Sequence, residues 1–194
     1  MQHSRIFILL GHSSTESLCG AVASAYELGA LEAGHEVRRM NMGEMRYDPI
    51  LHAGYQKIQE LEPDLQTFQA NVRWADHLVI VYPNWWSAMP AGLKGIFDRA
   101  WLPGFAYNFY KDGRLGWQKR LKGKSARIIT LSNAHPWLTW LFFGEFTNEL
   151  SRATLGFAGI RPVYVHVFSP SEKASPARVG WWLRRVKKWG SRAQ

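Results

Sequence analysis

The chain has 194 residues, 46% of them hydrophobic, and this size suits one domain spanning residues 1–194. Its formal net charge of +9 favours anionic ligands, but no helix-turn-helix, zinc-finger or RNA-recognition signature accompanies the basic residues, so we expect no nucleic-acid partner. The lack of an apolar run of about 18 residues, of a signal peptide and of a second cysteine favours a protein of the reducing cytoplasm.

Apolar runs predict five strands that alternate with helices. The strands are expected at 5–11, 37–42, 77–82, 127–131 and 163–168. Helices are expected from Leu18, from Pro63, from Pro90, along one helix through Phe146, Leu150 and Phe157, and at about 174–189. Such alternation implies right-handed crossovers and a parallel sheet. Five strands suit the flavodoxin-like order 2-1-3-4-5, a three-layer α/β fold with helices on both faces of the sheet.

The remaining segments are polar or irregular. Residues 48–61 and the stretch after Trp101 are predicted as long irregular connections. Much of the positive charge lies in Lys111–Arg127 and in the tail from Lys173 onward. The tail helix has one apolar face, which we expect to pack on the domain, with docking on an acidic membrane surface as the alternative. That face is formed by Val179, Trp182, Leu183, Val186 and Trp189.

The loop after the first strand is rich in hydroxyl groups. His12 and the run through Ser17 precede or open a helix, and a helix N-terminus with such donors suits a phosphate. No GxGxxG or GxxxxGK[ST] pattern is present. The alternative is ordinary helix capping, for which serine and threonine are preferred. Cys19 in the first helical turn is a candidate reactive thiol or a buried bystander.

The loop after the third strand carries two tryptophans, Trp85 and Trp86. In a sheet of the order 2-1-3-4-5 this loop and the loop after Gly11 flank the crevice where such folds bind ligands. Two tryptophans at that place predict walls for a flat aromatic ligand. The alternative is that they serve as anchors of the core or of a homodimer interface.

Four motifs resemble those of the flavodoxin-like NAD(P)H:quinone oxidoreductases, which include DT-diaphorase-like enzymes and ancillary oxidoreductases of bacterial potassium-efflux systems. The most specific is PNWWSAMPA at 83–91, followed by LKG at 93–95 and FDR at 97–99. His12 with Ser17 matches the first loop of the family, FAY at 105–107 matches the segment after the central helix, and LGFAG at 155–159 resembles the run before the last strand. The resemblance spans roughly residues 5 to 168.

The resemblance implies a bound flavin and assigns residues to its two ends. At the phosphate and ribityl end it implies His12, Ser17, Leu18 and Cys19. Against the ring it implies Pro83, Asn84, Trp85, Trp86 and Ser87, with backbone amides donating to the ring and Trp86 lining it. Donors fixed there would stabilise the negative charge of a reduced flavin.

The loop after the fourth strand departs from the family pattern. Many relatives carry Thr-Thr-Gly-Gly there, whereas this chain has LSNAHPW at 131–137. Ser132, Asn133 and Ala134 are still expected to present backbone N–H groups to the ring edge. His135 is the candidate catalytic residue because a histidine can donate a proton near neutral pH and so stabilise a developing hydroxyl anion on the substrate, and a loop histidine without that role is the alternative.

The resemblance implies a cytoplasmic homodimer with its active site at the subunit boundary, which passes a hydride from NADPH or NADH through the flavin to a quinone. FMN is expected, with FAD as the alternative, because the chain is short and shows no adenine pocket. The histidines show no metal-ligand spacing, so no metal is expected. The second hypothesis is a flavin-binding regulatory or ancillary subunit that contacts a membrane transporter, motivated by the basic tail.

Overall fold

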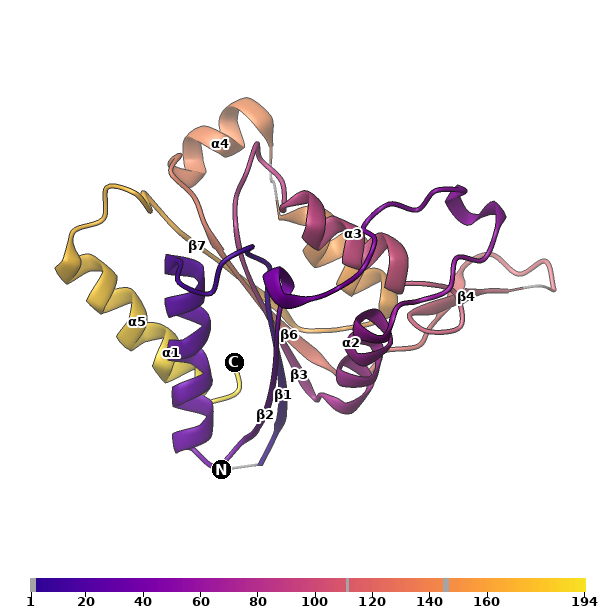
Figure 1. Ribbon diagram of the computed structural model, residues 1–194, viewed down its shortest axis with the longest axis horizontal. Coiled ribbons are helices and arrows are strands. Elements are labelled where there is room, and N and C mark those ends of the chain that lie inside the picture. The colour runs from indigo at the N-terminus through magenta and orange to yellow at the C-terminus, as the bar shows by residue number, and fades with distance from the viewer. Residues whose placement is uncertain (1–2, 111, 145–146) are drawn as a thin grey trace.

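A five-stranded parallel sheet forms the middle layer of the protein (Figure 1). The computed structural model describes residues 3–110, 112–144 and 147–194, so Phe146 of the predicted fourth helix lies outside the described residues. The sheet order is β2-β1-β3-β6-β7, which confirms the predicted fold class and strand order. The strands are β1 (Arg5–Leu10), β2 (Glu36–Asn41), β3 (His77–Pro83), β6 (Ser125–Leu131) and β7 (Val163–Phe168).

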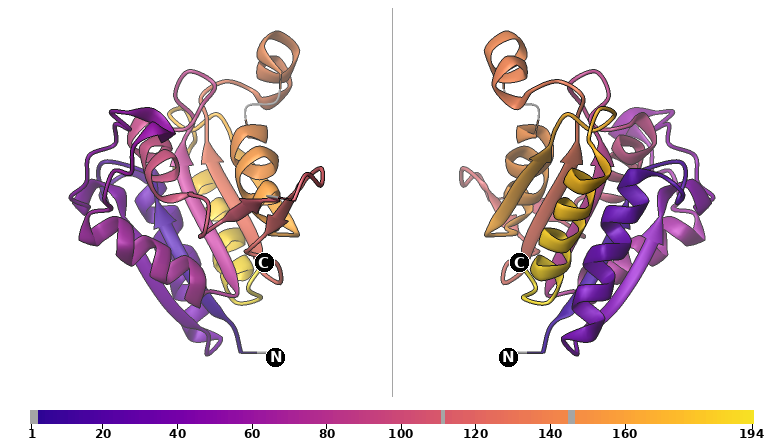
Figure 2. Two further views of the ribbon diagram at one scale, coloured as in Figure 1. Left: turned by 90° about the vertical axis from the view of Figure 1, so that its right-hand side faces the viewer. Right: turned by 90° about the vertical axis from the view of Figure 1, so that its left-hand side faces the viewer.

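Helices cover both faces of this sheet (Figure 2). One face carries α1 (Leu18–Glu32) and α5 (Pro176–Gly190), and the other carries α2 (Pro63–Trp74), α3 (Ala91–Ala100) and the π-helical segment η3 (Glu149–Gly156). Because both faces are covered, β3 is buried along its whole length. β2 forms one edge of the sheet, where Arg39 reaches Glu27 of α1 at 2.9 Å. The arginines of β2 therefore mark an edge strand, as predicted.

α1 and α5 pack with their backbones in close contact. A Cβ atom on Gly29 would lie 2.0 Å from the carbonyl oxygen of Lys187, and one on Gly190 would lie 2.1 Å from that of Tyr26. Only glycine allows these two approaches. The apolar face predicted for the tail helix packs on the domain, with Trp182 and Val186 fully buried. Within the described residues, no helix is both long and apolar enough to cross a bilayer.

Between α3 and β6 the chain forms a short antiparallel ribbon where an irregular connection was predicted. Its strands are β4 (Tyr107–Phe109) and β5 (Trp117–Lys119). Three-residue strands are too short for sequence periodicity to reveal. The ring of Trp117 stacks on Phe157 with ring centroids 4.2 Å apart, and its Nε1 donates to the Phe157 carbonyl oxygen at 2.7 Å. Phe157, the residue after η3, thus anchors the ribbon, and the rings of Tyr107 and Phe109 of β4 meet it as well.

The prediction of one continuous helix before the last strand is wrong. α4 (Pro136–Phe143) ends at Gly144, and η3 begins only at Glu149. Gly144 has φ 75°, a left-handed conformation that favours glycine and ends helices. The result is that α4 stands apart from η3 above the sheet (Figure 1).

The irregular connection before α2 contains two single turns, η1 (Met42–Glu44) and η2 (Gly54–Gln56), and is fixed by Arg99 of α3. The Arg99 side chain is fully buried. It donates to the carbonyl oxygen of Asp48, to that of Glu60 at 2.7 Å, and to the Glu62 carboxylate at 3.0 Å. The Arg99 guanidinium thus ties together three residues of a connection that has little regular structure.

We predict that Arg99→Leu lowers the free energy of unfolding by about 3 kcal/mol, because two backbone carbonyls and a carboxylate lose the buried guanidinium that donates to them. Urea denaturation followed by circular dichroism measures this change. The control is Arg46→Leu, an exposed residue of the same connection, for which a change within about 0.5 kcal/mol is expected. Equal stability of the two variants would contradict the assignment.

Candidate functional site

A cleft of about 290 Å³ opens at the carboxyl ends of the strands, between the loop after β1 and the loop after β3. β1 and β3 are neighbours in the sheet from which the chain departs in opposite directions, and ligands of open α/β sheets bind at such a point. Eleven residues line the cleft: His12, Ser17, Leu18, Cys19, Pro83, Asn84, Trp85, Leu131, Asn133, Ser171 and Glu172. The first seven and Asn133 are residues that the sequence predicted.

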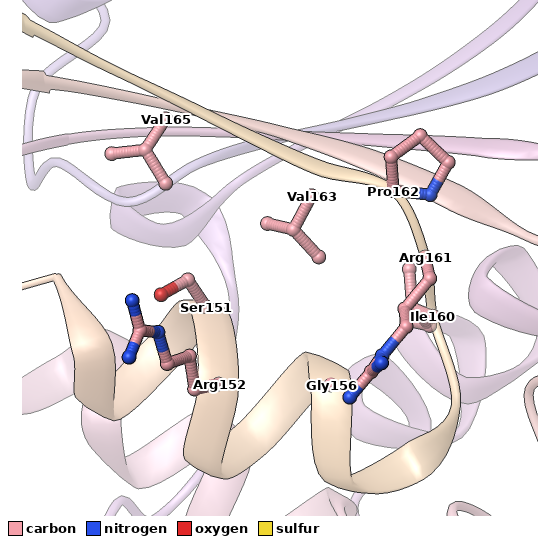
Figure 3. A pocket seen from close by; sticks show the side chains of 8 residues that line it. All are labelled: Ser151, Arg152, Gly156, Ile160, Arg161, Pro162, Val163 and Val165. Atoms are coloured by element: carbon pink, nitrogen blue, oxygen red, sulfur yellow. The ribbon is translucent and has the colours of Figure 1, made fainter.

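A larger groove of about 720 Å³ lies elsewhere, between η3 and the edge strand β7 (Figure 3). It is lined by Ser151, Arg152, Gly156, Ile160, Arg161, Pro162, Val163 and Val165. None of these is aromatic, and the groove faces no loop at the carboxyl ends of β1 and β3. Volume alone therefore does not locate the site, and the smaller cleft has the chemistry that the sequence predicts.

The loop after β1 is shaped by its own hydrogen bonds. Ser17 is the N-cap of α1: its Oγ accepts from the backbone N–H of Gly20 at 3.1 Å and donates to the carbonyl oxygen of Ser14 at 2.9 Å. The amide nitrogen of Ser14 lies 2.9 Å from His12 Nδ1. Ser17 is thus the helix cap that the sequence offered as the alternative, and it also lines the cleft.

Two glycines fix the position of this loop. A Cβ atom on Gly20 would lie 1.8 Å from the carbonyl oxygen of Thr15, and one on Gly43 would lie 2.0 Å from that of Ser13. The loop is therefore pressed between the first turn of α1 and η1, at distances that any larger residue would forbid. This holds the start of α1 open toward the cleft.

The loop after β3 is a tight turn with an unusual conformation. Trp85 and Ala88 exchange two backbone hydrogen bonds of 3.0 Å, and the two residues between them, Trp86 and Ser87, have φ of 54° and 58°. A left-handed tryptophan is sterically costly, and such strained residues cluster at functional sites. The turn separates the neighbouring tryptophans in space.

The two tryptophans have different surroundings. Trp85 lines the cleft, is 48% exposed, and meets the ring of His12 edge-on at a centroid distance of 5.9 Å. Trp86, by contrast, is fully exposed and is not part of the cleft lining, nor is Ser87. The resemblance implied that Trp86 lines a flavin ring; in the structure Trp85, not Trp86, lines the cleft.

A chain of hydrogen bonds joins this turn to the loop after β6. Asn84 Nδ2 donates to Ser132 Oγ at 3.2 Å, and Ser132 Oγ donates to the carbonyl oxygen of Ala134 at 3.2 Å. Ser132 is buried, so it and Ala134 support the cleft from behind and do not line it. His135 is exposed, precedes α4, and also lies outside the cleft lining.

The loop after β7 supplies cleft residues that the sequence analysis missed. Ser171 Oγ and the Glu172 amide both donate to Asn133 Oδ1, at 2.8 and 2.9 Å. β7 lies next to β6, so the loops that follow both strands meet at one end of the sheet. Strand order was the signal that pointed to them, because the carboxyl end of the fifth strand had to lie beside that of the fourth.

Cys19 is not a reactive thiol. Burial raises its pKa to about 12, so the thiolate that reactions of cysteine require is scarce at neutral pH. The alternative reading of Cys19 as a buried bystander is therefore favoured. Within the described part of the chain, no group of three or more histidine, cysteine, aspartate or glutamate residues is arranged to hold a metal ion.

The cleft fits a flavin by its donor and acceptor chemistry. The Oδ1 atom of Asn84 is buried and has no hydrogen-bond partner among the described residues, so a polar ligand group would satisfy it. One end of the cleft is the hydroxyl-bearing start of a helix, which suits a phosphate, and the other is the ring of Trp85.

The fold and this cleft define a flavodoxin-like protein, and a family model described as flavodoxin-like fold matches residues 4–186. Within that fold, the chain belongs to the NAD(P)H:quinone oxidoreductase family. An NAD(P)H oxidoreductase of Haemophilus influenzae is 36% identical over 167 residues, covering 83% of this chain and 81% of the relative. The Escherichia coli NAD(P)H oxidoreductase YcaK is 29% identical over 112 residues, covering 55% of this chain and only 57% of the relative.

Solved structures agree on the fold. Smu.1420 of Streptococcus mutans superposes with a TM-score of 0.83 at 28% identity, covering 97% of this chain and 99% of that one. An FMN-dependent NADH-azoreductase of Bacillus anthracis, solved with FMN, superposes with a TM-score of 0.76. At 19% identity, with 97% of this chain and 98% of that chain covered, the second likeness shows the fold alone.

We predict that Trp85→Ala weakens flavin binding about tenfold, because it removes the aromatic wall of the cleft. Trp86→Ala is the matched control: it deletes the same ring one position later, where the side chain is fully exposed. Fluorescence titration of the apoprotein measures both dissociation constants. A larger loss for Trp86→Ala than for Trp85→Ala would contradict the geometry.

Proposed function

We propose that the protein is a flavin-dependent NAD(P)H oxidoreductase that passes two electrons as a hydride to quinones or similar flat electrophiles. The observation that carries this proposal is the cleft itself, where an aromatic wall and a hydroxyl-bearing helix start meet at the switch point of a flavodoxin-like sheet. Membership of the NAD(P)H:quinone oxidoreductase family supports it.

Different residues of the cleft would bind the two ends of the flavin. Ser17, Leu18 and Cys19 at the start of α1 would hold the phosphate with the positive end of the helix dipole. Backbone amides of the turn at 84–88 and the ring of Trp85 would hold and polarise the isoalloxazine. A bound flavin supplies the hydride chemistry, so these residues only have to orient it and keep one ring face open.

The open cleft supports a ping-pong order of substrate binding, in which the two substrates use the same place in turn. One face of the ring would receive NAD(P)H, which leaves before the quinone occupies the same place. His135 remains our candidate for stabilising the reduced substrate. It is exposed on the loop after β6 and lies outside the cleft lining, so we assign it no part in holding the cofactor.

FMN is the cofactor that we propose, with FAD as the alternative. The Bacillus anthracis azoreductase of the same fold binds FMN, and the cleft of about 290 Å³ contains no second aromatic pocket for an adenine. The donor is NADPH or NADH. The net charge of +9 favours either phosphorylated dinucleotide and does not select between them.

The experiment is reconstitution of the purified protein with FMN or FAD, followed by NADPH and NADH oxidation with a simple quinone as acceptor. A yellow protein that turns over, with parallel double-reciprocal plots, is the expected result. Ser17→Ala is the companion variant: it removes the N-cap and should weaken flavin phosphate binding several-fold. Colourless protein that binds neither flavin would end the proposal.

We also propose that the protein works as a homodimer whose active site lies at the subunit boundary. α4 carries an aromatic outer face, on which Trp137, Trp140 and Leu141 are each more than 60% exposed, and it stands above the same end of the sheet as the cleft (Figure 1). Apolar surface of this kind is typical of protein interfaces, and a second copy would cover it while closing the cleft.

The double variant Trp137→Ser/Trp140→Ser is expected to shift the dimer to monomer and to lower kcat. Sedimentation velocity and steady-state kinetics measure the two effects. Trp181→Ser is the control, because that tryptophan is 48% exposed on α5, which covers a face of the sheet and not the end where α4 stands. An unchanged sedimentation coefficient for the double variant would place the interface elsewhere.

A cytoplasmic location fits a single, buried free thiol. The regulatory alternative, an ancillary subunit on a membrane transporter, was motivated by the basic tail. Because the apolar face of that tail is packed against α1 and the sheet, it offers no apolar contact to a partner, and the enzyme is the function that we prefer.

A further inference from the structure

The ribbon formed by β4 and β5 projects from the domain on the side away from α1 and α5 (Figures 1 and 2). Residues 112–127, which include β5, contain six lysines and arginines and a single acid, Asp112. Three of the six are engaged: Arg114 pairs with Asp112 at 2.8 Å, Lys124 donates to backbone carbonyls, and Arg127 is buried over Trp189. Lys119, Arg120 and Lys122 make no ion pair with any described residue.

These three cations, which we call the ribbon cations, share one groove. The groove has a volume of about 540 Å³ and is lined by Tyr110, Trp117, Gln118, Lys119, Arg120 and Lys122, with no carboxylate among them. Gly159 brings two of them together. A Cβ atom there would lie 2.8 Å from Lys119 Cβ and 3.0 Å from Lys122 Cγ, so the two stems converge over a glycine with φ of 100°. Three positive charges crowded around one groove repel each other unless an anion enters.

The tip of the same ribbon carries an apolar side chain. Leu115 is fully exposed and stands between Gly113 and Gly116, both in left-handed conformations that make a tight, projecting tip. A leucine held out in water at the end of a basic ribbon has no role in the core. An apolar tip beside cations is the arrangement by which peripheral proteins enter the boundary of an anionic bilayer.

Two features argue against a nucleic acid in this groove. Single-stranded nucleic acids bind by stacking bases on open aromatic faces. Here the ring of Trp117 is already stacked on Phe157, with Lys119 Nζ 5.6 Å from its centroid, and the ring of Tyr110 is covered by Arg114 at 4.5 Å. The groove therefore offers charge without free stacking surfaces.

We propose that the β4–β5 ribbon docks the protein on the surface of an anionic phospholipid bilayer. The ribbon cations hold the phosphate and carboxylate groups of the lipids, and Leu115 enters the acyl boundary. Docking needs no flavin, so membrane binding can be tested independently of the proposed enzymatic activity. It would place the protein beside the phase in which lipid-soluble quinones dissolve.

The test is co-sedimentation of the full chain, as purified, with vesicles of phosphatidylcholine alone or mixed with phosphatidylserine. Wild-type protein is expected to bind the mixed vesicles and to be released by salt. Arg120→Gln/Lys122→Gln should reduce binding on the order of twentyfold, since each cation near an anionic surface contributes a factor of roughly five. Leu115→Ser should weaken binding to the same vesicles and leave its salt dependence unchanged.

The matched control is Arg184→Gln/Lys188→Gln, which removes two exposed cations from α5 on the other face. Its binding should stay within about twofold of wild type. Equal losses for the two double variants would mean that net charge alone acts, and the proposal would be overturned. Three other results would also overturn the proposal. They are vesicle binding by Leu115→Ser as strong as that of the wild type, displacement of the protein by inorganic phosphate at matched ionic strength, and tighter binding to single-stranded RNA than to vesicles. Circular dichroism of each variant confirms folding.

Discussion

The site depends on the pairing of β3 with strands on both of its edges. This pairing continues one residue past the strands: the Gly11 amide donates to the Val81 carbonyl oxygen and the Asn84 amide donates to that of Leu131, each at 2.7 Å. The loops after β1, β3 and β6 are therefore released at the same level of the sheet. A crevice follows from this geometry, because the first two loops turn toward helices on opposite faces. The cleft residues on the loops after β1, β3 and β6 are placed by these two hydrogen bonds and by the strand pairing that precedes them.

The sequence could predict those elements of the fold whose local residue pattern is compatible with only one kind of secondary structure. Continuous apolar runs flanked by turn residues gave the five strands of the sheet, and their alternation with helices gave the order. Among the predicted residues that line the cleft, His12, Asn84 and Asn133 follow strand ends within two residues, so strand assignment places them. Backbone hydrogen bonding leaves little freedom at such positions. Ser17, Leu18 and Cys19 lie at the start of α1, and it was the family resemblance that singled them out.

The parts that sequence could not predict depend on contacts between distant segments. Which tryptophan faces the cleft is decided by a left-handed turn at Trp86 and Ser87, a conformation that neither residue type favours. The ribbon exists because Trp117 meets Phe157, and the break after α4 exists because Gly144 adopts a positive φ that its sequence neighbours do not reveal. Ser171 and Glu172 are held at the cleft by hydrogen bonds to Ser132 and Asn133, on the neighbouring loop.

The close approach of α1 and α5 has a consequence for how the chain reaches its folded state. The helix formed by residues near the start of the domain is covered by a helix made near its end, and the ion pair between Lys187 and Glu32 spans 155 positions. During synthesis, the part of this face that α5 covers therefore stays open until α5 itself has emerged from the ribosome. On the other face, α2 and α3 emerge much earlier. Such an order of assembly leaves the nascent chain with an exposed apolar surface for most of its translation, which is when a holding chaperone would have the most to bind.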